Sequence, residues 1–103
     1  MAATRIVKEL SYAAYKELIE KRPIRVSPHA YFRLSQMQRK VYKDETLIKM
    51  ITEEKPAFIG IQQNQNYAVF FSRKKGYQRL MFKVTSQYIE VITFYLCDHI
   101  PKI

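Results

Sequence analysis

The stretch SPHAYFRLSQMQRK, residues 27–40, combines residue types that could act on a phosphodiester. If a helix begins at its Ser-Pro pair, His29 lies in the first turn and Arg33 stands four positions later on the same face. The helix macrodipole keeps an imidazole at this end neutral, so His29 could act as a general base. The free N–H groups of the first turn and the Arg33 guanidinium could hold a phosphate, and Arg39 follows further along. The alternative is that His29 packs or caps locally and that Arg33 lies on a solvated face.

A second group of cations lies later in the chain and consists of Arg73, Lys74, Lys75, Arg79 and Lys83. The first three fall in a predicted hairpin turn. The last two fall on one side of a predicted strand, opposite side chains that are all apolar. This alternation predicts one face that belongs to the core and one that forms a basic floor.

Tyrosine is the other recurring residue, with eight in 103 positions. Aromatic rings interleaved with cations suit stacking on unpaired bases, although tyrosine is also a common strand residue. Tyr95 is our candidate among them, because it lies near the end of the last predicted strand, in phase with Thr93 and Val91.

The charge balance indicates a polyanionic partner. Lys and Arg number 18 against 9 Asp and Glu, which gives a formal net charge of +9. A generally basic, solvated surface is the alternative explanation of the same numbers.

Several classes of protein are excluded by composition. No apolar run approaches the ~20 residues that a membrane span needs, and the N-terminus lacks the apolar core of a signal peptide. The single cysteine, Cys97, forms no internal disulfide and is expected to be a packed thiol, as in a reducing, cytoplasmic setting. The carboxylates have no metal-ligand spacing, and Gly60 and Gly76 form no phosphate loop. We therefore expect neither a metal nor a cofactor, and no membrane partner.

The chain is expected to form one domain, residues 1–103. The spacing of its apolar residues is helical before Pro56 and strand-like after it. The helical half, about residues 4–55, contains a helix over about 4–21, a short helix that Ser27 and Pro28 begin, and a third that Asp44 caps. The third helix has an apolar face formed by Leu47, Ile48 and Ile51.

The second half, about residues 57–96, contains four runs rich in β-branched and aromatic residues: AFIGIQ, NYAVFFSR, QRLMFKVT and YIEVITFYL. Their connections are too short for parallel crossovers, so the runs predict an antiparallel meander. The fold class that follows is α+β, with N-terminal helices packed on one face of a twisted four-stranded antiparallel sheet.

Three of these features together resemble the RelE/ParE-like toxin superfamily: SPHAYFRL, a further helix that ends near a proline, and a last strand that reads IEVITFY. More narrowly, these features resemble small, uncharacterised members of the superfamily with a His-Ala and Arg helix motif and a valine-rich final strand that ends in Thr and Tyr. The resemblance spans about residues 27–96, and the first predicted helix lies outside it.

The resemblance implies a metal-independent endoribonuclease of the barnase/RelE-like fold, in which the ribose 2′-hydroxyl attacks the adjacent phosphate. Carried onto this chain, His29 is the base or acid, and Arg33 and Arg39 hold the phosphate. Arg79 is a further cation, and Tyr95 is a general acid or stacking platform. The implied partners are RNA, an acidic or amphipathic antitoxin protein and the ribosome.

Two hypotheses from other classes stand beside the ribonuclease toxin or its degenerate relative. One is a non-catalytic, basic nucleic-acid-binding module, in which Arg73, Lys74, Lys75 and Lys83 contact the backbone. The other is a protein-binding domain that adds a partner strand or helix to its sheet or groove.

Overall fold

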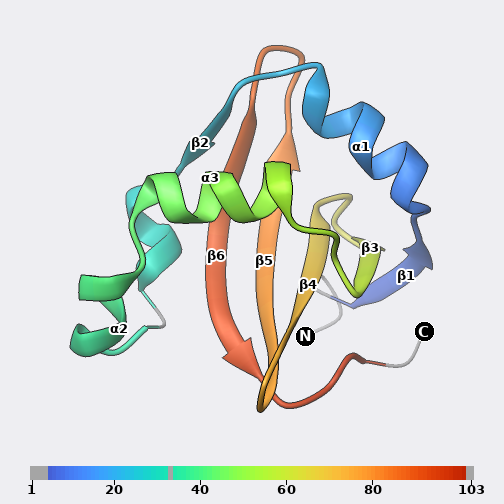
Figure 1. Ribbon diagram of the computed structural model, residues 1–103. Coiled ribbons are helices and arrows are strands. Elements are labelled where there is room, and N and C mark those ends of the chain that lie inside the picture. The colour runs from blue at the N-terminus through green and yellow to red at the C-terminus, as the bar shows by residue number, and fades with distance from the viewer. Residues whose placement is uncertain (1–4, 33, 102–103) are drawn as a thin grey trace.

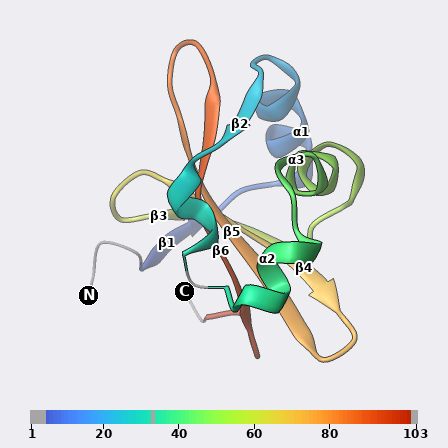
Figure 2. The ribbon, with the colours of Figure 1, turned by 90° about the vertical axis from the view of Figure 1, so that its left-hand side faces the viewer.

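The computed structural model of the chain describes residues 5–32 and 34–101. Over these residues the chain forms three α-helices, a one-turn 3-10 helix and one six-stranded sheet. Figure 1 shows α3 crossing the sheet, and Figure 2 shows that α1 and α3 lie on the same side of it. In chain order the elements are β1 (Ile6–Glu9), α1 (Tyr12–Glu20), β2 (Ile24–Val26), the 3-10 helix η2 (Pro28–Tyr31), α2 (Gln36–Val41), α3 (Asp44–Glu53), β3 (Phe58–Gln62), β4 (Tyr67–Arg73), β5 (Gly76–Val84) and β6 (Ile89–Cys97).

The predicted meander and the α+β class are confirmed. Strands β3, β4, β5 and β6 are consecutive neighbours and run antiparallel. Lys74 and Lys75 form the two-residue turn between β4 and β5. Gly76 follows with a φ of 128°, which glycine adopts without a steric penalty.

The prediction of one helix over residues 4–21 is wrong in its first half. Residues Ile6–Glu9 form β1, which pairs antiparallel with β3, and α1 begins only at Tyr12. Ser11 separates the two elements, because its Oγ accepts the Ala14 N–H at 3.2 Å and so caps α1. A four-residue segment of mixed polarity fits both the 3.6-residue period of a helix and the two-residue period of a strand. Residues Ile6–Glu9 form a strand because they pair with β3.

The sheet has two edge strands that the four-stranded prediction lacks. Its order is β1-β3-β4-β5-β6-β2, so both N-terminal strands lie at the edges. β2 pairs parallel with β6, from Ile24 opposite Ile89 to Val26 opposite Val91. The predicted order of helices first and sheet second is therefore wrong, and the sheet is mixed although mostly antiparallel. Three residues are too few to show a strand period in the sequence.

Both faces of the sheet carry apolar side chains. On the face under α1 and α3, Leu80 and Phe82 of β5 belong to the main core with Leu47 and Ile51 of α3. The opposite face carries a smaller group, here called the second cluster, which consists of Ile6, Ala68, Phe70 and Met81 with the partly buried Phe58, Tyr77, Ile92, Tyr95, Cys97 and Ile100.

The apolar face predicted for α3 is confirmed for Leu47 and Ile51, which are fully buried, while Ile48 is half-buried. Asp44 is the first residue of this helix rather than its cap, since Lys43 occupies the cap position. The cap differs by one residue because the Thr46 hydroxyl accepts the Lys43 N–H.

Gly60 sets the distance between β1 and β3. A Cβ atom at this position would lie 2.6 Å from Ile6 Cγ2 and 3.2 Å from Phe58 Cε1. Gly60→Ala should therefore lower the free energy of unfolding by about 1–3 kcal/mol, the usual cost of overpacking, as measured by urea unfolding. Ile6→Ala removes the clashing atom, so the double variant should lose less stability than the sum of the two single changes. Additive losses would show that the two side chains do not compete for space.

Tyr15 connects α1 to α3. Its ring is fully buried, and its hydroxyl donates to the Ile51 carbonyl oxygen at 3.0 Å. That carbonyl lies in the last turn of α3, where C=O groups lack partners within the helix. Burial, and to a smaller extent the neighbouring Tyr12, raises the pKa of Tyr15.

Tyr15→Phe should lower the free energy of unfolding by about 1 kcal/mol at neutral pH, because the Ile51 carbonyl loses its donor. The raised pKa also makes stability pH-dependent. Its contribution is complete below the ordinary tyrosine pKa of 10.0, where the unfolded chain starts to ionise, and is lost as the pH rises further. Urea unfolding between neutral and strongly alkaline pH should therefore show a shallower decline for Tyr15→Phe. Parallel declines in both proteins would contradict this assignment.

Candidate functional site

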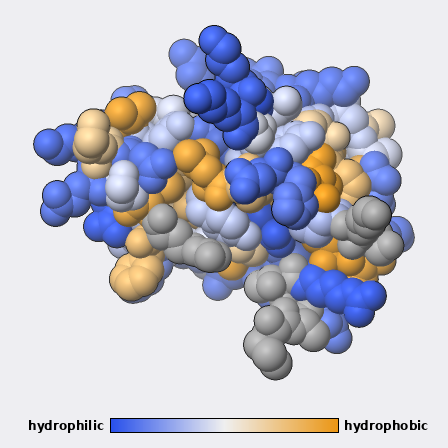
Figure 3. Space-filling view, turned by 90° about the horizontal axis from the view of Figure 1, so that it is seen from below, coloured by the Kyte–Doolittle hydropathy of each residue, from blue (hydrophilic) through white to orange (hydrophobic). Residues whose placement is uncertain are grey.

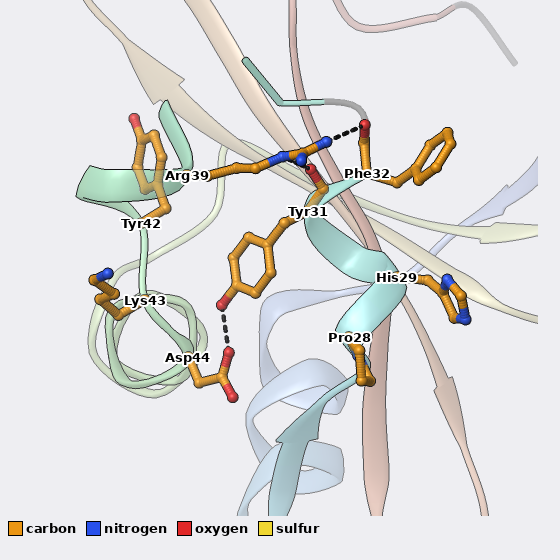
Figure 4. A pocket seen from close by; sticks show the side chains of 8 residues that line it. All are labelled: Pro28, His29, Tyr31, Phe32, Arg39, Tyr42, Lys43 and Asp44. Atoms are coloured by element: carbon orange, nitrogen blue, oxygen red, sulfur yellow. Dashed lines mark hydrogen bonds between the residues drawn. The ribbon is translucent and has the colours of Figure 1, made fainter. Parts of the chain in front are cut away.

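Two surface hollows share Tyr42, the residue that follows α2. The first hollow, of about 520 Å³, lies between η2, α2 and the start of α3 (Figure 4). The second hollow, of about 550 Å³, lies between the end of α2, the β4–β5 turn and the end of β6. Among the residues predicted to form a site, the first hollow contains His29 and Arg39. The second is lined by three others: Arg73, Lys74 and Lys75.

The helix predicted to carry His29 and Arg33 on one face is a single 3-10 turn that ends at Tyr31. The i, i+4 relation between the two residues therefore has no helix to support it, and Arg33 lies outside the described residues. Ser27 is the cap, as predicted, and its Oγ accepts the His29 N–H at 3.2 Å. The Ala30 N–H donates to the Ser27 carbonyl. The N–H groups of residues 29 and 30 are thus used within the turn and are not the free donors that the predicted phosphate site requires.

His29 has an exposed side chain that points away from Tyr31, Arg39 and Asp44 (Figure 4). Arg39 has a structural role that the sequence did not predict. Its Nε donates to the Tyr31 carbonyl at 3.0 Å and its Nη2 donates to the Phe32 carbonyl at 2.9 Å. These bonds join α2 to the end of η2, and the side chain is fixed by backbone groups.

Tyr31 closes the other side of the first hollow. Its hydroxyl donates to Asp44 Oδ1 at 2.6 Å, which joins η2 to the first turn of α3. Burial raises the pKa of Tyr31, and the hydrogen bond to Asp44 and the negative charge of that carboxylate raise it further. The charged groups that line this hollow are thus the Asp44 carboxylate and the cations of Arg39 and Lys43.

Arg79 and Tyr95 lie in a different place, in the second cluster. They are opposite each other on β5 and β6, with the guanidinium carbon 5.8 Å from the centre of the Tyr95 ring. The same carbon lies 5.0 Å from the centre of the Phe70 ring, and Arg79 Nη2 donates to Gln62 Oε1 at 3.2 Å. Arg79 is only 9% exposed, so the basic floor predicted for this face is wrong. Among the predicted catalytic residues that the structure describes, His29 and Arg39 line the first hollow, whereas Arg79 and Tyr95 lie in the second cluster.

An irregularity in β6 explains why Tyr95 is on that face. Met81 is opposite Thr93 but Phe82 is opposite Val91, so Ile92 is an extra residue in the ladder. Val91 therefore belongs to the main core and Tyr95 to the second cluster. The predicted common phase of Tyr95 with Val91 is wrong, because strict alternation does not continue through a bulge.

Tyr42 is held rigidly between the two hollows by a chain of polar contacts. Arg73 donates to both carboxylate oxygens of Glu54, at 2.9 and 3.2 Å, and through Nε to Gln78 Oε1 at 2.7 Å. Gln78 is 3% exposed and donates through Nε2 to the Tyr42 hydroxyl oxygen. The Tyr42 ring also packs edge-on against Phe94, with centroids 5.0 Å apart. Arg73 is therefore neutralised and serves to position Tyr42.

Lys74 and Lys75 are the exposed cations of the second hollow, and no ion pair within residues 5–32 and 34–101 neutralises them. Tyr77 adds a second ring to the lining and Asp98 adds one carboxylate. Figure 3 views the molecule from the end that carries this turn, and hydrophilic side chains surround scattered apolar ones there. Lysines beside fixed aromatic rings are the surface that unpaired bases and phosphates bind.

Lys83, the fourth cation predicted to bind nucleic acid, does not line this hollow. Its Nζ lies 3.6 Å from Glu90 Oε1, and the other oxygen of that carboxylate lies 3.6 Å from Arg25 Nε. Sequence reasoning missed Tyr42 and Gln78, which are 36 positions apart. The only signal for them was a glutamine at a core position of an apolar strand.

Comparison with known proteins gave no match to a family model, a curated protein or a solved structure. The resemblance to RelE/ParE-like toxins therefore stays a prediction. No three His, Cys, Asp or Glu among the described residues lie close enough to hold a metal ion. None of the helices in the same part of the chain is long and apolar enough to cross a bilayer.

Arg39→Lys keeps the charge but removes the planar group that reaches two carbonyls. We expect faster amide exchange over η2 and α2, equivalent to about 1–3 kcal/mol of lost local stability. Hydrogen exchange followed by mass spectrometry measures this, with Lys40→Arg on the same helix as the control. Unchanged exchange in Arg39→Lys would show that the guanidinium is not what holds this segment.

Proposed function

We propose that this chain binds single-stranded RNA without cutting it, through the second hollow. The observation that carries the proposal is the Tyr42 ring, which Gln78 and Phe94 hold beside the two exposed lysines of the β4–β5 turn. In this arrangement an unpaired base stacks on Tyr42 while Lys74 and Lys75 contact the neighbouring phosphates.

The electrostatics support the same partner. A net charge of +9 attracts a polyanion over a distance comparable to the Debye length, about 8–10 Å at moderate salt. The side chain of Tyr42 is already fixed in the absence of a ligand, so stacking costs little conformational entropy. A single strand fits better than a duplex, because a duplex does not offer the faces of its bases to a ring.

The first test is fluorescence anisotropy with a labelled, mixed-sequence single-stranded RNA at several salt concentrations. Lys74→Ala and Lys75→Ala should each weaken binding and reduce the slope of log affinity against log salt by about 0.7, the value for one phosphate contact on a single strand. Lys83→Ala removes the same charge outside the hollow and should leave the slope nearly unchanged. Equal effects of all three substitutions would mean that only the overall charge matters, and would contradict the assigned surface.

Tyr42 gives an independent measurement in the same assay. Tyr42→Leu should cost about 1–3 kcal/mol of binding free energy, the contribution of one stacked base. Tyr42→Phe keeps the ring but loses the bond from Gln78 that positions it, so it should weaken binding less than Tyr42→Leu does. Urea unfolding of both variants checks that the fold is retained. Equal binding by the leucine and phenylalanine variants would rule out stacking on this ring.

Cleavage is the second candidate, favoured by the exposed imidazole of His29 at the edge of the first hollow. Incubating the same RNA with the protein in EDTA, with and without ribosomes, tests it directly. Cutting that His29→Ala abolishes would support the ribonuclease that the resemblance implies. Intact RNA, bound equally well by His29→Ala, is the result expected from the binding function.

A further inference from the structure

The first hollow has no part in the proposed RNA binding, yet it shares Tyr42 with the second hollow. The Tyr42 side chain is fixed by Gln78 and packs edge-on against Phe94. A strand that stacks one base on Tyr42 can reach the first hollow with a neighbouring nucleotide, because the same side chain lines both. The polar groups of the first hollow then decide which base fits there.

The Asp44 carboxylate is held in one orientation in this hollow. The Tyr31 hydroxyl donates to its Oδ1 at 2.6 Å, and the residue is exposed. Within residues 5–32 and 34–101, its Oδ2 accepts no hydrogen bond and no ion pair includes it. A charged acceptor in a fixed position is thus open to a ligand that donates an N–H group.

Lys43 and Tyr42 lie on one side of the Tyr31–Asp44 bond, whereas His29 and Phe32 lie on the other side (Figure 4). Lys43 is exposed and lines the same hollow as Asp44. Its positive charge offsets the repulsion between the carboxylate and the phosphates of a bound strand. A base can therefore approach the carboxylate from the side that carries Tyr42.

Cytosine and uracil respond in opposite ways to a carboxylate. Cytosine carries the N4 amino group, which donates to an aspartate or glutamate oxygen. Uracil carries the O4 carbonyl oxygen at the same position, which a carboxylate repels. The Tyr31 hydroxyl cannot donate to that oxygen, because its proton is already donated to Asp44. A base that brings an unsatisfied carbonyl to this position loses affinity.

We infer that the first hollow is a base subsite that prefers a base with an exocyclic amino group, such as cytosine, to uracil. The Asp44 carboxylate makes the selective contact, and Tyr31 is a positioning residue that holds the carboxylate in place. The subsite rests on the proposed function, since a strand must first bind at Tyr42, and it adds a sequence preference to that function.

The test compares oligocytidylate with oligouridylate of equal length by fluorescence anisotropy, above neutral pH, where cytosine is not protonated. The two strands carry the same phosphates and both have pyrimidine bases, so the ratio of their affinities isolates the edge of the base. The protein should bind oligocytidylate about fivefold more tightly, which is the low end for one specific contact to a base edge. Equal affinities for the two strands would overturn the subsite.

Asp44→Asn should bring this ratio to about one, because the amide of asparagine can donate to uracil O4 as well as accept from cytosine N4. Glu45→Gln removes the same charge from the next residue, which does not line the first hollow, and should leave the ratio unchanged. Tyr31→Phe should lower the ratio with little change in affinity for oligouridylate, because the carboxylate loses the bond that holds it. Urea unfolding checks that each variant is folded. A ratio unchanged in Asp44→Asn, or changed equally in Glu45→Gln, would overturn the contact.

The lysines of the second hollow distinguish failure of the subsite from failure of the proposed function. Binding of both strands that Lys74→Ala weakens equally, with no preference for cytosine, would leave the proposed function intact and overturn the subsite alone. Preference for cytosine with no effect of Lys74→Ala or Lys75→Ala would support the subsite and contradict the second hollow. Absence of binding to either strand would overturn both.

Discussion

The alternation of side chains along β5 is the constraint on which the arrangement of this molecule depends. Successive residues of a strand point to opposite faces, so Leu80 and Phe82 enter the main core while Arg79 and Met81 enter the second cluster. Since β5 is paired on both sides along its length, it cannot rotate to bring the two sets together. Arg79 therefore points to the second cluster and cannot reach the first hollow, where His29 lies.

Gln78 lies on the same face of β5 as Leu80 and Phe82, but its side chain is polar. It is a polar residue at a core-facing position, and burying it requires partners for its amide. Arg73 and Tyr42 supply them, and through Arg73 the network reaches Glu54 at the end of α3. One buried amide thus fixes the relative positions of a strand, a hairpin turn and the residue after α2, which together enclose the second hollow.

Sequence predictions were most accurate for elements whose local residue pattern and tertiary contacts favour the same structure. The meander followed from four apolar runs with short connections, and the Ser27 cap and the buried face of α3 followed from residue types at fixed offsets. β1 and β2 could not be predicted, because strands of four and three residues exist only through pairing with β3 and β6. The candidate site was only partly predictable for the same reason. The lysines of the turn were found from their neighbours in the chain, whereas Tyr42 and the bulge at Ile92 depend on contacts between distant segments.

The positions of β1 and β2 have a consequence for how the chain reaches this fold. Both strands precede the meander in the chain, yet they occupy its two outer edges. During synthesis they therefore emerge before β3 and β6 exist, and they must wait for partners that are more than fifty residues away in the chain. Until they dock, the meander has two open edges that another chain can pair with. The two shortest strands that the structure describes thus replace the edges of β3 and β6 with shorter edges, of four and three residues.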